Sequence, residues 1–300
     1  MGTGPAGARG RTLISRKMSR FGTISFVLFA ILCVVTVRAQ DLDALGEMVR
    51  NGTTEEKRTA LFDLRNIRTP EASRLAVPAL SDPDELVRST AAGSVVFLPP
   101  DEVVAVLLPN LKDKEDFVRR ETAYALGKVR DRTAVRPLVE VASKDKSFEV
   151  RNAAVFALGE IGDPSAVDFL VALLSGKPKD SRAFERSSAA KSIGRIAQAI
   201  QNSSRSPVTP ESFLPSKYKA AGAAAFRDLA TEFPQFKRAL PVLEKALSNS
   251  KEAADTRREA AFAIGAIDGG SRETLKKCSV SPDYYLAEIC KEGLLKAESR

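Results

Sequence analysis

Residues 118–127 read VRRETAYALG, and residues 150–159 read VRNAAVFALG. Looser copies of this stretch surround four other arginines, Arg58, Arg88, Arg186 and Arg257. Successive repeat arginines are 30, 31, 32 and 35 residues apart up to Arg186, and 71 residues separate Arg186 from Arg257. A period of about 30 to 35 residues is typical of stacked units of two helices.

Each copy has the apolar pattern of a helix that packs on one side. Apolar residues recur three or four positions apart in the two best copies. They are Ala123, Leu126 and Val129 in the first, and Ala154, Leu158 and Ile161 in the second. Because several of these residues are alanines, we expect adjacent helices to approach each other closely.

Glycines and aspartates indicate where the helices begin and end. A glycine follows the apolar residues in four copies, at Gly127, Gly159, Gly194 and Gly265. We expect the helix to end near this glycine, since glycine is the usual helix terminator. Asp131 and the pair Asp163-Pro164 come next, and they are typical of a helix start.

An aspartate lies five residues before the valine of three copies, and an arginine follows that valine. The aspartates are Asp82, Asp113 and Asp145, and the arginines are Arg88, Arg119 and Arg151. With the ending Ala-Leu-Gly-x-Ile/Val-x-Asp, the pattern resembles HEAT repeats, in particular the subgroup shared with phycobilin lyase subunits, over residues 54–268. The resemblance implies an all-α fold, a right-handed α-solenoid of stacked two-helix HEAT-like repeats. It also implies that the aspartates form turns, bridged in a ladder by the arginines.

The first 39 residues have the composition of a secretory signal peptide. Basic residues extend to Arg20, an uncharged run covers residues 24–37, and Ala39 offers a cleavage site before Gln40. The alternative is an uncleaved anchor, but the run would reach only about 21 Å, short of the roughly 30 Å hydrocarbon core. A start at Met18 would give a leader of more usual length. We therefore expect export to the periplasm or secretion, with no stable membrane span after cleavage.

The remaining chain, residues 40–300, is predicted to be one repeat array. Prolines and serines interrupt it near residues 176–183 and 202–217, which we expect to be loops. The second loop either forms a lip over a binding groove or is a solvated excursion. Residues 217–231 are expected to be helical, as part of a degenerate repeat, and residues 271–298 to form a C-terminal helical cap.

Composition bears on the class of partner. The chain has a formal charge of +8, but six of its 46 basic residues and none of its 38 acidic residues lie in the first 39 positions. The rest is nearly balanced, so we expect no broad basic field for phosphate and no nucleic-acid partner. We expect a protein or peptide partner instead.

The two cysteines beyond the leader are Cys278 and Cys290. In an oxidising compartment they are expected to form a disulfide, and the alternative is two unrelated buried thiols. The chain contains no histidine, which is the commonest general base and metal ligand. We therefore expect no enzymatic activity, no metal site and no cofactor.

One position supplies the candidate binding surface. Five residues after the repeat arginine the chain carries Tyr124, Phe156, Lys191 and Phe262, and charged residues flank the first two at Arg120, Glu121, Lys128 and Glu160. Related repeats often expose this position on the concave side of the second helices. Exposed aromatic rings with a charged rim suit a protein or peptide ligand. The alternative is that the rings only pack between neighbouring helices.

The sequence thus predicts a non-enzymatic exported scaffold that binds a protein or extended peptide through its concave face. Two other functions remain open. One is an accessory subunit that handles a tetrapyrrole, as the resemblance to phycobilin lyases implies. The other is a purely structural envelope protein whose groove is filled by its own loop.

Overall fold

The computed structural model describes residues 41–178, 182–203, 227–267 and 272–298. By contacts the chain divides into two units, residues 1–44 and residues 45–300. The first unit lies almost entirely outside the described residues, as does the predicted signal peptide. The second unit is the repeat array, and its described residues contain helices and turns but no strand.

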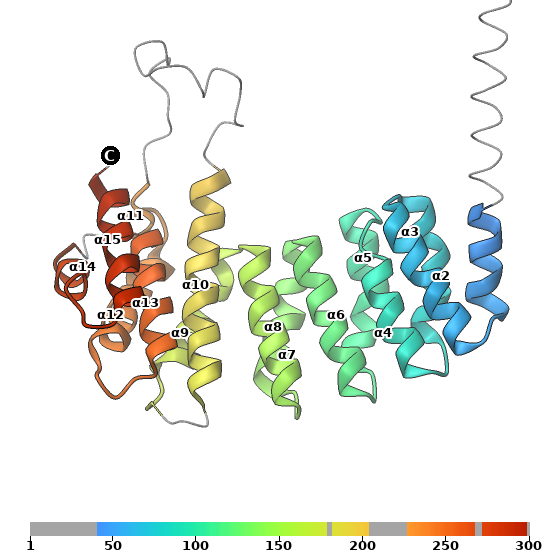
Figure 1. Ribbon diagram of the computed structural model, residues 1–300, viewed down its shortest axis with the longest axis horizontal. Helices are drawn as coiled ribbons and strands as arrows, with labels where there is room; N and C mark the ends of the chain where they lie inside the picture. The colour runs from blue at the N-terminus through green and yellow to red at the C-terminus, as the bar shows by residue number, and fades with distance from the viewer. Residues whose placement is uncertain (1–40, 179–181, 204–226, 268–271, 299–300) are drawn as a thin grey trace, which may run out of the picture. The chain divides into compact units, whose positions relative to one another are not determined.

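The array is built from pairs of helices (Figure 1). The second helices of the pairs are α2 (Thr54–Ile67), α4 (Glu85–Ser94), α6 (Asp116–Val129), α8 (Phe148–Ile161), α10 (Ala183–Ser203), α13 (Ala254–Ile267) and α15 (Tyr284–Glu298). Each of them contacts the next one along the series, so they form one continuous layer. This layer confirms an α-solenoid.

The first helices form the other layer and include short 3₁₀ segments. They are α3 (Pro70–Ala76) with η1 (Val77–Ser81), α5 (Pro100–Leu107) with η2 (Leu108–Lys112), η3 (Arg132–Ala134) with α7 (Val135–Lys144), η4 (Pro164–Ala166) with α9 (Val167–Ser175), α11 (Leu229–Glu232) with α12 (Pro234–Ser248), and α14 (Arg272–Cys278). Helices α14 and α15 occupy the predicted C-terminal cap.

Side-chain caps start several helices where the sequence predicts them. The carboxylate of Asp131 accepts from the backbone N–H of Thr133 and caps η3. Asp163 caps η4 in the same way, through the backbone N–H of Ser165. These bonds satisfy N–H groups that have no partner within the helix.

The repeat glycines have a different role from the one predicted. Gly127, Gly159, Gly194 and Gly265 lie inside their helices, and α6 and α8 end two residues later, at Val129 and Ile161. A Cβ atom on Gly127 would lie 2.7 Å from Cα of Ala157 on α8, and one on Gly159 would lie 2.8 Å from Oγ of Ser192 on α10. The glycines therefore permit close contact between second helices.

Among the described residues, no other second helix lies between α10 and α13. These two helices pack directly against each other, although 50 residues separate their ends in sequence. Most of the predicted helix 217–231 lies outside the described residues, and in the described part α11 begins only at Leu229. The 71-residue spacing of the repeat arginines therefore reflects one repeat with an insertion.

Candidate functional site

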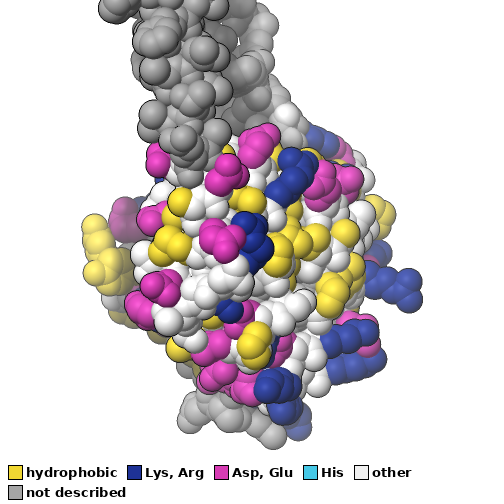
Figure 2. All heavy atoms as spheres, turned by 90° about the vertical axis from the view of Figure 1, so that its right-hand side faces the viewer, with side chains coloured by type: hydrophobic (Ala, Val, Ile, Leu, Met, Phe, Trp, Pro, Cys, Tyr) yellow, Lys and Arg dark blue, Asp and Glu magenta, His cyan; other side chains and the backbone are white. Residues whose placement is uncertain are grey.

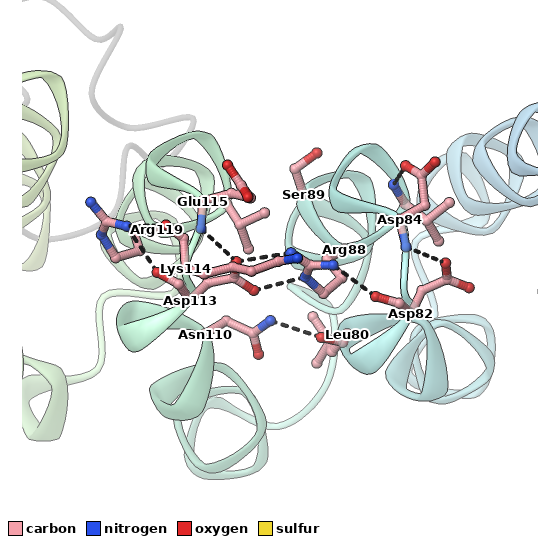
Figure 3. A network of polar contacts seen from close by, with 12 residues as sticks. Leu80, Asp82, Asp84, Arg88, Ser89, Asn110, Asp113, Lys114, Glu115 and Arg119 are labelled. Atoms are coloured by element: carbon pink, nitrogen blue, oxygen red, sulfur yellow. Dashed lines mark hydrogen bonds and ion pairs between the residues drawn. The ribbon is translucent and has the colours of Figure 1, made fainter. Parts of the chain in front are cut away.

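A ladder of ion pairs joins the turns between consecutive repeats. Arg88 donates from Nε and Nη2 to the carboxylate of Asp113 in the next repeat, at 2.7 and 2.9 Å, and from Nη1 to the backbone oxygen of Asp82 at 2.8 Å (Figure 3). Arg119 reaches Asp145 with the same geometry, at 2.7 and 2.9 Å. Each arginine thus binds its own turn and the following one.

The ladder continues beyond the aspartates that the sequence predicts. Arg151 donates to Glu185 at 3.0 Å, and Arg186 donates from Nε to Glu252 at 3.0 Å across the insertion. Sequence reasoning missed both glutamates because neither has the spacing of the three aspartates. At the other end the ladder cation is Lys57, which binds Asp82 at 2.7 Å.

Two carboxylates of the ladder, those of Asp113 and Asp145, have a lowered pKa that favours their charged form. Burial alone would raise the pKa of Asp113, but the hydrogen bonds from Arg88 and from the backbone N–H of Glu115 leave that pKa below its ordinary value. The pKa of Asp145 is lowered by the same combination, with Arg119 and Ser147 as donors. These groups are occupied with one another, so the ladder is a structural feature rather than a reactive one.

The second-helix layer has an exposed face opposite the first helices. The fourth residue of each second helix from α2 to α13 is basic, and the position five residues later lies on this face. These six positions are Phe62, Gly93, Tyr124, Phe156, Lys191 and Phe262. The rings of Tyr124 and Phe156 meet edge to face, with centroids 5.7 Å apart. Tyr124 remains 41% exposed and Phe156 36% exposed, so they are not simply packed between helices.

Phe262 differs from these two rings. A Cβ atom on Gly194 would lie 2.5 Å from two of its ring carbons, so the ring packs closely against α10 at this glycine. The packing alternative therefore applies to Phe262, which is half-buried.

Three adjoining hollows run across this face. The first, of about 490 Å³, is lined by Tyr124, Lys128, Arg130, Phe156 and Glu160. The second, of about 570 Å³, shares Arg130 and Glu160 with the first and lies between α8 and α10. The third, also of about 570 Å³, shares Arg195 and Gln198 with the second and extends to Tyr285 on α15. We call this continuous surface the trough.

Most charges in the trough are paired across neighbouring helices. Arg195 lies over the ring of Phe156, 4.8 Å from its centroid, and forms an ion pair with Glu160. Glu160 also accepts from Arg130 at 3.3 Å. Lys191 binds Glu259 at 3.1 Å. These contacts form a charged rim around apolar ring surfaces.

The structure brings together some predicted site residues and separates others. Tyr124, Phe156, Lys128 and Glu160 line one hollow, and Lys191 and Phe262 line another. Arg120 and Glu121 instead pair with each other at 3.0 Å, and Arg120 lies over Phe117 outside the hollows. Sequence reasoning missed Arg130, Arg195 and Tyr285, which do not occupy the aromatic repeat position.

Cys278 and Cys290 lie at disulfide distance, with Cα atoms 6.0 Å apart. Cys278 lies at the end of α14, and Cys290 lies in the middle of α15. Among the described residues, no group of three or more His, Cys, Asp or Glu side chains is arranged to hold a metal ion. No helix in the described part of the chain is long and apolar enough to span a membrane.

Three solved structures are similar to parts of the chain. The chain is similar to an engineered protein, with 20% identity, 86% of this chain and 68% of the other covered, and a TM-score of 0.49. It is similar to the complex of CpcE and CpcF of phycocyanin lyase from Nostoc, with 18% identity, 85% and 87% coverage, and a TM-score of 0.46. It is also similar to human deoxyhypusine hydroxylase, with 21% identity, 89% and 99% coverage, and a TM-score of 0.40.

The comparison with curated proteins found no match. The family model for HEAT repeats matches residues 42–125 and 104–194, which together make up half of the chain. Since these residues carry the ladder and the close packing of second helices described above, the protein belongs to the HEAT-repeat family.

Proposed function

We propose that the protein is a scaffold that binds an extended peptide segment of a partner protein along the trough. The observation that carries this proposal is the continuity of three hollows around exposed rings on one face of the second helices. HEAT repeats generally serve protein binding, which is consistent with such a surface. A binding role of this kind requires no reactive group.

The dimensions of stacked helices favour an extended ligand. Packed helices lie about 8–10 Å apart, and an extended chain advances about 3.3 Å per residue. A peptide that runs across the second helices would therefore place every third residue over a new helix. From α6 to α15 the trough crosses four such steps, which corresponds to a peptide of about 12 residues.

The exposed rings are expected to supply most of the affinity. Tyr and other aromatic residues are enriched at positions that dominate binding energy, because they bury a large area with little loss of side-chain freedom. Tyr124 and Phe156 are already fixed against each other, and Arg195 holds the second ring in place. Ligand side chains can thus pack on a preformed surface.

Export is the second part of the proposal. It is supported by the leader, with its basic start, its uncharged run at residues 24–37 and Ala39 before Gln40. The short distance between Cys278 and Cys290 also suits an oxidising compartment. If the leader is removed, the first residue of the mature protein will be Gln40, and sequencing of its N-terminus in the native host tests this.

The binding proposal is tested by selecting peptides from a random library of 12-residue sequences on the purified protein. The dissociation constant of the best peptides is then measured on Tyr124→Ala/Phe156→Ala. We expect affinity to fall about 30-fold, which corresponds to about 2 kcal/mol at two central contacts.

A matched control removes another aromatic pair between adjacent second helices. The ring centroids of Phe148 on α8 and Phe184 on α10 lie 5.9 Å apart, and neither residue lines any of the three hollows. The variant Phe148→Ala/Phe184→Ala should bind within about twofold of wild type. Equal losses in both double variants, or no selected peptide at all, would contradict the proposed function.

A further inference from the structure

A cluster of basic side chains lies on the second-helix face beside the first hollow of the trough. It consists of Arg65 and Arg68 from the end of α2 and Lys128 from α6, and we call it the basic cluster. Lys128 itself lines the hollow with Tyr124 and Phe156. The cluster and the trough are therefore one continuous surface.

Arg65 occupies a position that is glycine in most of the other second helices. It stands eight residues after the ladder cation Lys57, where α6, α8, α10 and α13 carry glycine. Its guanidinium lies over α4, because its Nη1 is 3.2 Å from the position of a Cβ atom on Gly93. Gly93 has no side chain, so the space above α4 is open to this cation.

Lys128 belongs to α6, which packs on the other side of α4 from α2. Its Nζ lies over the ring of Phe97, 5.3 Å from the centroid. The pKa of Lys128 is lowered, first by partial burial and then by the charges of Arg65 and Arg68. The charges of Arg65 and Arg68 thus repel that of Lys128.

The cluster has no internal counter-charge among the described residues. None of Arg65, Arg68 and Lys128 takes part in an ion pair or a side-chain hydrogen bond with an acidic residue there, although Asp63 lies on the same helix as Arg65. The other cations of the trough are paired: Arg130 and Arg195 with Glu160, Lys191 with Glu259, and Arg258 with Asp283. The basic cluster is the exception on this face.

The α2 end of the molecule carries charges of both signs. Figure 2 views the molecule from the side on which α2 lies in Figure 1, and both signs of charge are present there with hydrophobic side chains between them. A focused group of uncompensated cations next to exposed rings suits a small number of carboxylates.

We propose that the basic cluster binds two or three carboxylates of the same extended peptide that fills the trough, so that the partner presents an acidic stretch adjacent to apolar residues. This inference rests on the proposed function and specifies its ligand. The step from α4 to α6 places the acidic stretch about three residues away from the side chain that packs on Tyr124 and Phe156.

The test uses the peptide selection described above with one further target, the charge-reversed variant Arg65→Glu/Arg68→Glu/Lys128→Glu. Wild type should enrich peptides with Asp or Glu about three positions from an apolar residue. The charge-reversed variant should enrich Lys or Arg at that position instead. A wild-type peptide should bind about 10-fold more weakly to Arg65→Gln/Arg68→Gln/Lys128→Gln, as expected for three exposed charge pairs of about 0.5 kcal/mol each.

A matched control removes three cations from the first-helix layer. Lys112, Arg136 and Lys237 are exposed there and line none of the hollows of the trough. The variant Lys112→Gln/Arg136→Gln/Lys237→Gln has the same net charge as the triple variant of the cluster. It should bind the peptide as wild type does at about 0.15 M salt, where long-range effects of net charge are screened.

The outcomes separate this inference from the proposed function. If selected peptides depend on Tyr124 and Phe156 but carry no acidic preference, the trough stands and the inference is wrong. If no peptide is selected, both are wrong. If a single-stranded oligonucleotide of 12 nucleotides binds more tightly than any acidic peptide and loses affinity in the glutamine variant, the cluster recognises phosphate and the acidic-peptide inference is overturned.

Discussion

The side chains of Arg88 and Asp113 are about nine-tenths buried, and this decides how their contact acts on stability. A buried ion pair gains little over an apolar pair of the same shape, because both charges lose their hydration. Removal of one partner is costly, however, since the other charge stays buried without a counter-ion. The ladder therefore fixes the angle and register between consecutive repeats. We call each of its ion pairs a rung, and loss of one partner of a rung lowers the free energy of unfolding.

The first prediction concerns one rung. Asp113→Ala should lower the free energy of unfolding by about 3 kcal/mol, because Arg88 loses both side-chain acceptors. Urea denaturation followed by circular dichroism measures this. Glu102→Ala is the control, since Glu102 pairs with Arg74 at 3.1 Å on the exposed surface and its loss should cost less than about 1 kcal/mol. Equal losses at both sites would show that the rung has no special role.

The second prediction is a pH dependence. Because the pKa of Asp113 is lowered in the folded state, its contribution is complete above the ordinary aspartate value of 3.8. The contribution disappears as pH falls through the lowered folded value. The stability difference between wild type and Asp113→Asn should thus be constant from pH 7 to about pH 5 and shrink below pH 4. A difference that does not change with acid would contradict this role.

At the residue scale the sequence predicts the ladder only where its pattern is regular. Asp82, Asp113 and Asp145 share a spacing, so their position in turns could be inferred. The roles of Glu185 and Glu252 could not be inferred. These two glutamates accept from the ladder arginines as the aspartates do, but they do not share the spacing of the aspartates in the sequence. Exposure of Tyr124 and Phe156 also could not be read from sequence, since a ring at a repeated position can face solvent or a neighbouring helix.

Helix-to-helix distance is set by the glycines in the second helices. Gly127 and Gly159 allow α6, α8 and α10 to meet with almost no side chain between their backbones. The sequence analysis took these glycines as helix ends because glycine is common at both kinds of position. Only the spacing to the next helix distinguishes the two roles, and that spacing is a tertiary property.

The third prediction compares two glycines in equivalent helices. Gly127→Ala should lower the free energy of unfolding by about 1–3 kcal/mol, because its Cβ would collide with the backbone of Ala157. Gly93→Ala should be neutral or stabilising by up to about 1 kcal/mol. Its Cβ would meet only the mobile end of Arg65, and alanine is the better helix former. Thermal and urea unfolding of both variants provide the measurement, and the reverse order would contradict the packing role.

The whole array is continuous across the insertion. Helices α10 and α13 are in contact, and Arg186 and Glu252 form a buried ladder rung between their repeats. The side-chain amide of Gln201 binds the backbone of Arg227 through both its nitrogen and its oxygen, at 2.7 and 3.0 Å. The two ends of the insertion are therefore held together by described residues, while residues 204–226 themselves lie outside them, as does most of the predicted lip at 202–217.

The fourth prediction concerns the insertion, whose two ends are held together by the contact between Gln201 and Arg227. Replacement of residues 204–226 by a Gly-Ser linker of about six residues should leave the helical content unchanged. The free energy of unfolding should rise by about 1 kcal/mol, since a shorter loop loses less entropy on closure. Circular dichroism and size-exclusion chromatography check the outcome. Aggregation of the shortened protein would instead indicate that the segment covers the array, as in a purely structural protein.

At the scale of the molecule the sequence predicts the architecture well and the ligand poorly. The repeat period and the helix signals follow from local physics, so they can be read without coordinates. The contact between α10 and α13 could not be predicted, because the insertion separates these two helices in the sequence. The trough depends on Arg130, Arg195 and Tyr285 from three different helices, and only their assembly shows that the hollows join.

The central claim is that a peptide occupies the trough, and site-specific photo-crosslinking tests it most directly. A benzophenone amino acid is placed at Tyr124 in the trough or at Arg136, which lines a separate hollow of about 730 Å³ on the first-helix layer. Each protein is irradiated with the best selected peptide. The account predicts a crosslinked product from position 124 and none from position 136. A product from position 136 with none from position 124 would contradict it and move the binding surface to the first helices.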